Sequence, residues 1–549
     1  MNTLDFLSRL RKLGVNLSVE NQKLRLNAPQ GVLTPSLKAE LKDRKIELLN
    51  FLREQQHAGF AAPPPIRPIE RSSDMPLSFA QQRLWFLTQM EPEQPVYNVP
   101  MAFRLSGLLS IEALSQSFAD MIARHEILRT TFSTIDGQPV QIINESVDKP
   151  LPIRDFQHLP DDKREIEVQN AVKQEITKPF DLESGPLFRT RLLRLAPSEH
   201  ILLILTHHIV FDGWSYEILC HELTALYASN VTGQPLRLPK LPIQYANFAA
   251  WQREWLQGPF LETQADYWRK QLADAPTVLQ LPTDHPYPTV QRLRGRNYNF
   301  ALPPELSLAL HTFSQQEGST LFMTGLASFM VLLYRYTRQK DLIVGTPIAN
   351  RSHVELEGLI GPLINTLALR TIISEGLSFR ELLAQVRRTA LAAYDHQDLP
   401  FEKLVELLQL ERDISHTPLF QVMFVLQQKT SNLLALTGLK VSEIELDTHT
   451  AKFDLTLNLI EGKTGIRGQL EYNTDLFDNA TIARLVGHYE TLLENIVANP
   501  EQRISDVQIL TDRERKQMLV EWNDTSVSYT HLTLPTNRVA GWGGGGGGG

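Results

Sequence analysis

The chain contains the stretch Ile201-Leu202-Leu203-Ile204-Leu205-Thr206-His207-His208-Ile209-Val210-Phe211-Asp212-Gly213, and the expected fold is built outward from it. The aliphatic residues 201–205 predict a strand that is buried on both faces. Asp212 and Gly213 predict a turn, and residues 214–227 have the pattern of a helix. The two histidines therefore fall at a strand-to-helix corner. Because neighbouring side chains on a strand point to opposite faces, we expect one imidazole to face a cleft and the other to pack inward.

The string His-His-x-x-x-Asp-Gly is specific, because 15 His and 29 Gly in 549 residues would produce it by accident only ~0.001 times. A histidine pair that only fills a core and a metal site are the alternatives. A metal needs a third ligand at helical or hairpin spacing, and the sequence offers none there. His221-Glu222-Leu223-Thr224-Ala225 lacks the second histidine of a zincin, and no Gly-x-Ser-x-Gly nucleophile elbow occurs. We therefore expect no metal.

The bulk composition narrows the class of protein. With 549 residues and 42% hydrophobic residues, the chain can bury about three or four domain-sized units. A net charge of -8 and a pI near 6.0 argue against nucleic-acid binding. The single cysteine, Cys220, excludes a disulfide within the chain. There is no signal-peptide pattern, and the longest apolar run, Phe329 to Tyr334, is far short of the ~20 residues that cross a membrane, so we expect a cytoplasmic protein.

Residues 1–57 have the pattern of a separate small unit. The apolar spacing predicts a helix, a hairpin over Val15–Val19 and Lys23–Leu26, and two more helices, an αββαα order. This segment holds ten Lys or Arg and six Asp or Glu, so it carries +4, and the remainder carries -8 minus 4, or -12. An ordinary solvated face and a surface for an acidic partner both fit this charge.

The rest of the chain divides into four expected segments. A Pro-rich linker covers 58–74, and two large α/β (α+β) units cover 75–240 and 241–515. Residues 516–549 are expected to be the start of another linker followed by a tail that is foreign to the fold. Gly543–Gly549 is homopolymeric, and Ser528–Arg538 resembles translated sequencing-adapter DNA. We expect the natural chain to have continued beyond this point.

Seven motifs in order resemble the condensation domains of non-ribosomal peptide synthetases, a superfamily that includes chloramphenicol acetyltransferase. Two depart from the family pattern: Asn247 stands where Asp is usual, and Leu363 replaces a common aromatic residue. The motifs are Leu77–Leu87, Arg124–Phe132, His207–Gly213, Tyr245–Trp251, Ile360–Arg370, His396–Glu402 and Arg412–Phe420. The resemblance implies two chloramphenicol-acetyltransferase-like lobes in a V-shaped pseudo-dimer, with a tunnel at their junction.

The resemblance also implies a subtype and neighbours. The fifth motif and Gly213-Trp214-Ser215 look like the type that joins an L-configured donor to an L-configured acceptor. Residues 1–57 resemble the TubC-like docking domain at the start of some synthetase subunits. Leu519–Thr525 resembles the start of a linker to an adenylation domain. The implied partners are upstream and downstream carrier proteins, and an upstream synthase subunit that binds residues 1–57 through an acidic tail.

The family reaction implies roles for named residues. Donor and acceptor arrive as thioesters on the 4'-phosphopantetheine arms of carrier proteins, and this chain itself binds no cofactor. His208 is the expected catalytic residue, either as a base or by positioning the amine. His207 is expected to support it, and the backbone N–H of Gly213 to help hold a substrate. Asp212 is expected to be structural and to pair with Arg124, or alternatively with a later arginine such as Arg351.

Four further residues complete the expected site. Arg129 is a second supporting arginine, and Trp214, Ser215 and Asn365 are candidates for the tunnel wall. Two other functions stay open. One is an acyltransferase of the same superfamily that uses acyl-CoA, and the other is a non-catalytic docking or interaction module.

Overall fold

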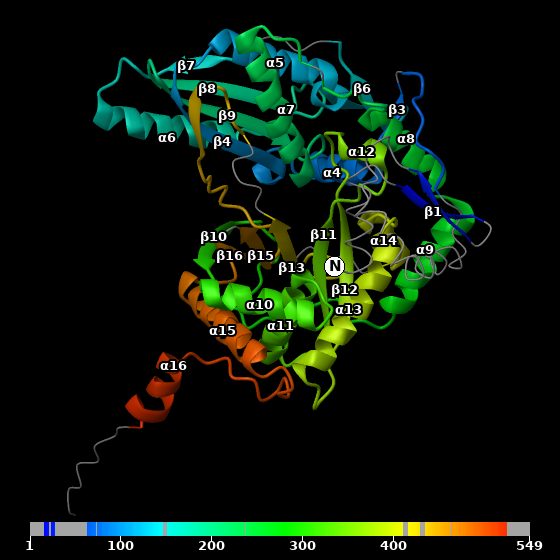
Figure 1. Cartoon of the computed structure of the whole chain (residues 1–549), viewed down its shortest axis with the longest axis vertical. Helices are drawn as coiled ribbons and strands as arrows, with labels where there is room; N and C mark the ends of the chain where they lie inside the picture. Colours follow the sequence, from blue (N-terminus) through cyan, green and yellow to red (C-terminus); the bar gives the residue numbers. More distant parts are fainter. Residues whose placement is uncertain are drawn as a thin grey trace, which may run out of the picture.

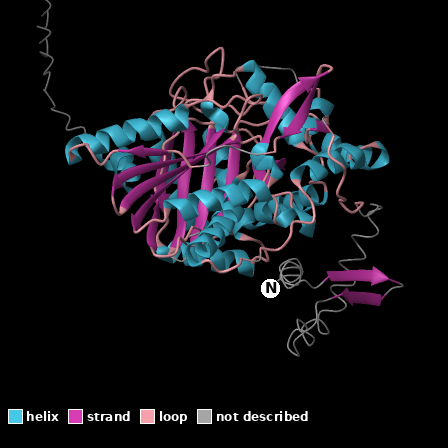
Figure 2. Cartoon of the chain, turned by 90° about the horizontal axis from the view of Figure 1, so that it is seen from above, coloured by secondary structure: helices cyan, strands magenta, loops and turns pink. Residues whose placement is uncertain are grey.

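The computed structural model describes residues 16–20, 23–27, 63–72, 74–145, 151–236, 238–409, 416–428, 434–462 and 464–523. Two lobes stand one above the other, and each is built on a twisted sheet with helices packed against it (Figure 1). Strands and helices are mixed throughout both lobes (Figure 2). This confirms the α/β prediction of two lobes.

The N-terminal segment contains the predicted hairpin. Strand β1 (Asn16–Glu20) pairs antiparallel with β2 (Lys23–Asn27), with Asn16 opposite Asn27 and Glu20 opposite Lys23. The helices predicted on either side of it lie outside the described residues.

The first lobe contains a five-stranded sheet in the order β14-β4-β9-β8-β7 and a three-stranded sheet in the order β3-β6-β5. Helices α5 and α7 pack side by side over the larger sheet (Figure 1). Every residue of β9 except the first is buried, as expected of the aliphatic run. The strands are β3 (Met75–Pro76), β4 (Asn98–Gly107), β5 (Thr130–Ile135), β6 (Gln138–Ile143), β7 (Ile153–Asp155), β8 (Phe188–Ala196), β9 (Glu199–His207) and β14 (Leu439–Glu443). The helices are α4 (Phe79–Met90), η1 (Pro95–Tyr97), α5 (Ile111–Arg124), η2 (Glu126–Arg129), α6 (Asp161–Thr177) and α7 (Gly213–Thr232).

The second lobe contains a six-stranded sheet in the order β10-β16-β15-β13-β11-β12. Helices α10, α11, α13 and α15 lie against this sheet (Figure 1), and α11 is the most deeply buried of them. The strands are β10 (Gly295–Ala301), β11 (Asp341–Ile348), β12 (Asn365–Ile372), β13 (Val422–Gln428), β15 (Leu455–Gly462) and β16 (Gly465–Asn473). The helices are α8 (Tyr245–Trp255), α9 (Gly258–Gln271), α10 (Pro304–Gln316), α11 (Leu321–Thr337), α12 (Val354–Glu357), α13 (Phe379–Asp395), α14 (Phe401–Leu407), α15 (Asn479–Ala498), α16 (Asp512–Lys516) and η3 (Gln517–Glu521).

No single helix in the described part of the chain is both long and apolar enough to cross a membrane. Helices α10 and α11 meet these conditions only when taken together, and a bend of 106° separates them.

Several segments that follow residue 240 pack in the first lobe, so a division of the chain at residue 240 does not separate the two hydrophobic cores. Strand β14 leaves the second lobe and pairs with β4, with Leu439 opposite Gly107. Apolar side chains of α8 and of the 356–363 segment join the core of the first lobe. These side chains are buried only because they pack on the first lobe, and this crossing over ties the two lobes together.

Candidate active site

The corner between β9 and α7 has the predicted strand–turn–helix form. Strand β9 ends at His207, and α7 begins at Gly213. The N–H of Val210 donates to the carbonyl of His207 (3.0 Å), and that of Phe211 donates to the carbonyl of His208 (3.3 Å). Val210 and Phe211 are fully buried, so hydrogen bonds within the turn and packing of these two side chains in the core both fix its backbone.

His207 points into the first lobe and is 3% exposed. Its Nδ1 accepts the N–H of Ile209 (3.1 Å), and its ring centroid lies 6.1 Å from that of Tyr97 and 5.9 Å from that of Phe180. Burial, and then the positive charge of Lys452, lower the pKa of His207 to about 3. A neutral imidazole with Nδ1 already in use is suited to supporting the turn.

His208 is half-buried, and its backbone N–H donates to the carbonyl of Tyr97 (2.9 Å). Burial holds the pKa of His208 well below its ordinary value, and the charges of Lys452 and His207 act in the same direction. A hydrogen bond with the backbone of Phe211 opposes them. The imidazole is therefore neutral around pH 7, the form that can accept a proton or a hydrogen bond from an amine.

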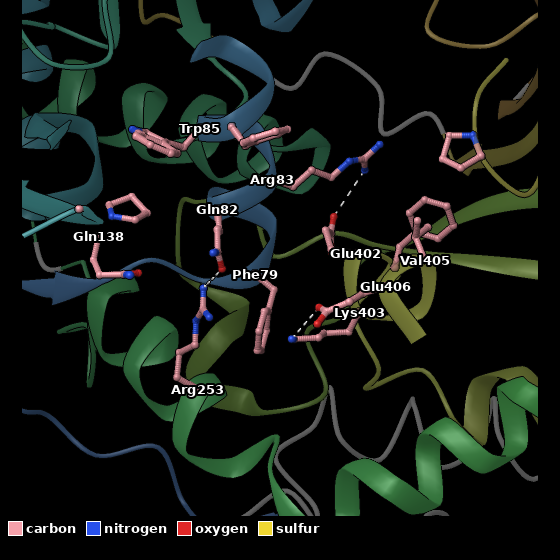
Figure 3. A pocket seen from close by; sticks show the side chains of 15 residues that line it. Phe79, Gln82, Arg83, Trp85, Gln138, Arg253, Glu402, Lys403, Val405 and Glu406 are labelled. Atoms are coloured by element: carbon pink, nitrogen blue, oxygen red, sulfur yellow. Dashed lines mark hydrogen bonds and ion pairs between the residues drawn. The ribbon is translucent and has the colours of Figure 1, made fainter. Parts of the chain in front are cut away.

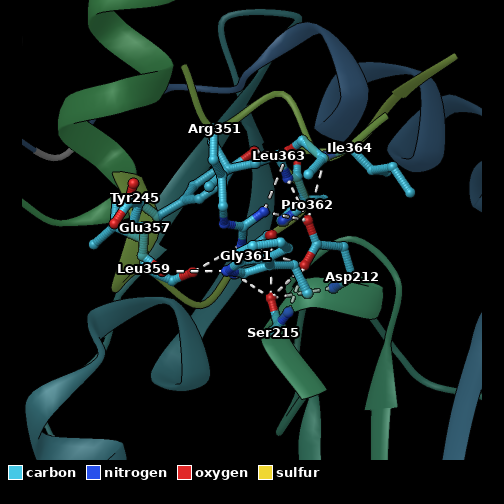
Figure 4. Close-up of polar contacts among 12 residues, drawn as sticks. Asp212, Ser215, Tyr245, Arg351, Glu357, Leu359, Gly361, Pro362, Leu363 and Ile364 are labelled. Atoms are coloured by element: carbon cyan, nitrogen blue, oxygen red, sulfur yellow. Dashed lines mark hydrogen bonds and ion pairs between the residues drawn. The ribbon is translucent and has the colours of Figure 1, made fainter. Parts of the chain in front are cut away.

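Asp212 is the N-cap of α7 and is 1% exposed. Its Oδ1 accepts the N–H of Ser215 (2.8 Å) and the hydroxyl of Ser215 (2.6 Å). The Arg351 guanidinium donates twice, from Nη1 to Oδ2 (3.0 Å) and from Nη2 to Oδ1 (3.3 Å), as Figure 4 shows. Oδ2 also accepts the N–H of Leu363 (3.0 Å) and of Ile364 (3.3 Å). One carboxylate therefore holds both the start of α7 and the 351–364 segment.

The same segment is held by a second set of contacts. The N–H of Gly361 donates to Ser215 Oγ (3.0 Å), and the hydroxyl of Tyr245 donates to the carbonyl of Pro362 (3.0 Å) (Figure 4). Gly361 has φ +149°, and a Cβ built there would lie 2.1 Å from Cδ2 of Tyr245. Only glycine allows this close approach of the backbone to the tyrosine ring.

The model of the family described as "Condensation domain" matches residues 71–519, and that of the "TubC N-terminal docking domain" matches residues 4–54. The chain belongs to the condensation-domain family. Linear gramicidin synthase subunits B and C of Brevibacillus parabrevis are 50% and 48% identical to it over 84% and 87% of this chain. The chain spans only 9% and 6% of the length of these two subunits.

Solved structures agree with this assignment. The X-domain of teicoplanin biosynthesis, solved in complex with OxyB, is 29% identical, with a TM-score of 0.74 over 82% of this chain and 99% of that chain. The first condensation domain of the calcium-dependent antibiotic synthetase has a TM-score of 0.68 over 80% of this chain and all of that chain, and its 20% identity supports the fold alone.

The condensation domain does not use Arg124 as the partner of Asp212, so that prediction was wrong. Arg124 donates instead to Glu222 (3.0 Å) and to the carbonyl of Pro239 (2.7 Å). Glu222 lies ten residues beyond Asp212, which is about 15 Å along a helix. The alternative partner, Arg351, is the one that the structure brings to Asp212.

Arg129 holds the end of a helix rather than the histidine corner. Its Nη1 donates to the carbonyls of Ile122 (2.8 Å) and Ala123 (2.9 Å), which lie in the last turn of α5. These contacts satisfy carbonyls that have no partner within the helix. Arg129 therefore supports the end of α5, and its supporting role at the active site stays a prediction.

Two of the three candidates for the tunnel wall are buried structural residues. Ser215 is fully buried in the cap of α7. Asn365 is 7% exposed, and its side chain donates to the carbonyls of Gln397 and Leu399 (both 2.8 Å) and accepts the N–H of Phe401 (3.0 Å). Trp214 is different, because it is 43% exposed and its Nε1 donates to the carbonyl of Glu357 (3.3 Å).

Gly213 is the first residue of α7 and faces outward. A Cβ built at this position meets no atom within 4 Å. The fold itself therefore does not require glycine here, and open space lies in front of the residue.

A cavity of about 660 Å³ opens between the lobes of this condensation domain, between α4 and α14 (Figure 3). Phe79 and Phe86 contribute apolar surface from α4, and Phe86 is 48% exposed. Arg83 of α4 and Glu402 of α14 form an ion pair across the junction (3.4 Å). The described residues contain no group of three His, Cys, Asp or Glu side chains arranged to hold a metal ion.

Lys452 was not predicted as a site residue, and its Nζ lies 5.4 Å from the ring centroid of Tyr97. Its charge acts on both His207 and His208. Lys452 follows these residues by more than 240 positions and belongs to the other lobe, so no local spacing in the sequence connects them.

Proposed function

We propose that this condensation domain forms a peptide bond between two thioesters carried on the 4'-phosphopantetheine arms of carrier proteins, with an L-configured donor and an L-configured acceptor. The observation that carries the proposal is the half-buried His208 on a corner whose backbone is fixed by hydrogen bonds to Tyr97 and Phe211, and burial favours its uncharged ring. The chain itself holds no cofactor in this reaction. We place the reaction in the cytoplasm.

The chemical step balances without a covalent enzyme intermediate. The amine nitrogen of the acceptor attacks the thioester carbonyl carbon of the donor, and a C–N bond forms. The C–S bond then breaks, and the amine proton leaves by way of His208 and ends on the donor thiol. His208 acts as the base or orients the amine by accepting its hydrogen bond, and either role requires the uncharged ring.

The neighbouring residues keep His208 in place. His207 fills the space behind the turn, and the Asp212–Arg351 pair fixes the start of α7 against the 351–364 segment. The open space at Gly213 leaves room for a substrate to approach the helix start. We propose Trp214, which is partly exposed beside Arg351, as a residue of the tunnel wall.

The proposed partners are an upstream carrier that brings the donor and a downstream carrier that brings the acceptor. Residues 1–57 would bind the acidic tail of an upstream synthase subunit, in line with their charge of +4. Complementary charge raises the rate of encounter more than it raises affinity.

The test uses the full chain with two carrier proteins loaded with aminoacyl groups. We expect a dipeptide on the acceptor carrier, detected by mass spectrometry. The substitution His208→Ala should reduce its formation by about 10²–10⁴-fold. His221→Ala is the matched control, because His221 is exposed on α7 and should have no effect. Equal product from the His208→Ala protein would refute the catalytic role.

The same assay separates the two alternative functions. Transfer from free acyl-CoA to a small alcohol or amine, without carriers, would indicate the acyl-CoA-dependent acyltransferase. A folded wild-type chain that makes no product from either donor would favour a non-catalytic interaction module. The likeness to the X-domain solved in complex with OxyB is the reason for keeping that second candidate.

A further inference from the structure

The segment before β15 holds Lys452 on a fixed backbone. The N–H of Ala451 donates to the carbonyl of Leu293 (2.9 Å), and the N–H of Asp454 donates to the carbonyl of Gln421 (2.9 Å). Ala451 is 1% exposed, and a Cβ added to Gly295 would come within 2.4 Å of its side chain. The backbone is therefore held on both sides of Lys452.

This side chain reaches from the second lobe to the first. Lys452 Nζ lies 5.4 Å from the ring centroid of Tyr97, in η1 of the first lobe. The carbonyl of Tyr97 accepts the N–H of His208 (2.9 Å), and its ring lies 6.1 Å from that of His207. Tyr97 is therefore a common neighbour of the ammonium and of both histidines.

The carboxylate of Glu471 forms a hydrogen bond with the backbone of Lys452. Within the part of the chain that the structure describes, no salt bridge to the Lys452 Nζ accompanies this contact. Glu471 attracts it from β16, and Arg83 repels it from α4. Burial lowers the pKa of Lys452 to about 8, so the amine is mostly charged at pH 7. A half-buried cation without an ion pair at its ammonium is costly to keep, and such a charge is a candidate for function.

We propose that Lys452 is a positioning residue of the reaction centre, supplied by the second lobe, which acts through its positive charge on His208 and on the negative charge that develops in the reaction. The inference rests on the proposed function. Lys452 transfers no atom. Its charge disfavours the protonated form of His208, and it favours the oxygen anion that forms when the amine adds to the thioester carbonyl.

Three variants of the full chain test the role in single-turnover peptide formation with loaded carriers. Lys452→Met removes the charge and keeps the length, and Lys452→Arg keeps the charge. Lys340→Met is the matched control, because Lys340 is an exposed lysine of the same lobe that pairs with Glu375. We expect Lys452→Met to lower the rate at saturating carriers about tenfold below pH 8, with Lys452→Arg within about threefold of wild type.

The pH profile separates charge from structure. In the wild type, the advantage over Lys452→Met should shrink above pH 8, where Lys452 loses its proton, whereas Lys452→Arg should keep its advantage. The acid limb of the Lys452→Met profile should also move to higher pH, because the positive charge of Lys452 no longer lowers the pKa of His208. Unchanged rate and profile in Lys452→Met would overturn the inference.

A variant of Glu471 separates an effect of charge from a loss of folding. Glu471→Gln removes the carboxylate whose charge raises the pKa of Lys452, so the pH above which the rate advantage over Lys452→Met shrinks should move below 8, while the rate at pH 6 is maintained. A rate that falls by the same factor at every pH would mean that the two residues only support the structure. An inactive wild type would instead refute the proposed function, and the two failures are therefore distinguishable.

Discussion

Asp212 and Arg351 lie 139 positions apart in the chain, yet their side chains form a two-point ion pair in which each is at most 2% exposed. Asp212 starts α7 in the first lobe, and Arg351 follows β11 of the second lobe. Every acceptor direction of the carboxylate is used by Arg351, Ser215, Leu363 or Ile364. The aspartate of the motif therefore connects the two lobes through its hydrogen bonds and its ion pair.

The first prediction concerns the ion pair between Asp212 and Arg351. Asp212→Ala leaves the Arg351 charge buried without its partner, which typically costs about 3–5 kcal/mol. We expect a lower melting temperature together with lower peptide formation. Arg351→Met should have a similar effect, and the double variant should be less destabilised than the sum of the two, as measured by denaturant unfolding. Arg269→Met, at an exposed ion pair, is the control and should leave the stability almost unchanged. A stable, active Asp212→Ala protein would contradict the structural role.

The second prediction separates Arg124 from the site. Arg124→Met removes two contacts, to Glu222 and to the carbonyl of Pro239, and leaves the Asp212 cluster intact. We expect a lower melting temperature with an unchanged single-turnover rate at a temperature where the variant is folded. A loss of rate without a loss of stability would return Arg124 to the active site.

The sequence carried enough information to find the histidine corner and the hairpin, because both depend on neighbours in the chain. A run of aliphatic residues followed by Asp-Gly specifies a strand, a turn and a helix cap within about a dozen positions. The choice between Arg124 and Arg351 could not be made in this way. Both arginines are far from Asp212 in the sequence. Only the path of the chain between the lobes decides which of them contacts Asp212. The same limit explains why β14 and Lys452 were missed.

The third prediction concerns stability against pH. Burial, and then the charge of Lys452, lower the pKa of His207 to about 3 in the folded chain, from the ordinary 6.5. Between these values the unfolded chain binds a proton that the folded chain does not. His207 therefore adds stability above pH 6.5 that is lost as pH falls, by about 1.4 kcal/mol per unit. Asp398 and Asp454, whose pKa values burial raises to about 6, oppose this trend in the same window.

A comparison of variants isolates the histidine from the two aspartates. His207→Gln keeps a hydrogen-bond acceptor near the N–H of Ile209 but does not titrate. The difference in unfolding free energy between wild type and this variant should shrink from pH 7 to pH 5, measured by urea unfolding at each pH. A difference that stays constant over this range would mean that His207 is not buried in its neutral form.

The fourth prediction uses the open space at Gly213. A side chain there meets no protein atom within 4 Å, and the backbone is not in the left-handed region, so Gly213→Leu should fold with an unchanged melting temperature. If a substrate occupies this space, the leucine variant should form less peptide than the wild type. The amount formed by Gly213→Ala should lie between these two. Full activity of the leucine variant would show that no substrate comes close to the start of α7.

The fifth prediction concerns residues 1–57, which carry +4 against -12 in the remainder of the chain. An acidic tail would be attracted to this segment and repelled by the rest. The association rate of the full chain with C-terminal peptides of candidate upstream subunits should therefore fall when salt is raised from about 50 to 500 mM, while the dissociation rate changes little, because screening acts mainly on the encounter. Surface plasmon resonance measures both rates. A peptide whose Asp and Glu are replaced by Asn and Gln is the matched control and should bind slowly at both salt concentrations. Association that does not depend on salt would count against the charge argument and leave apolar contacts as the basis of docking.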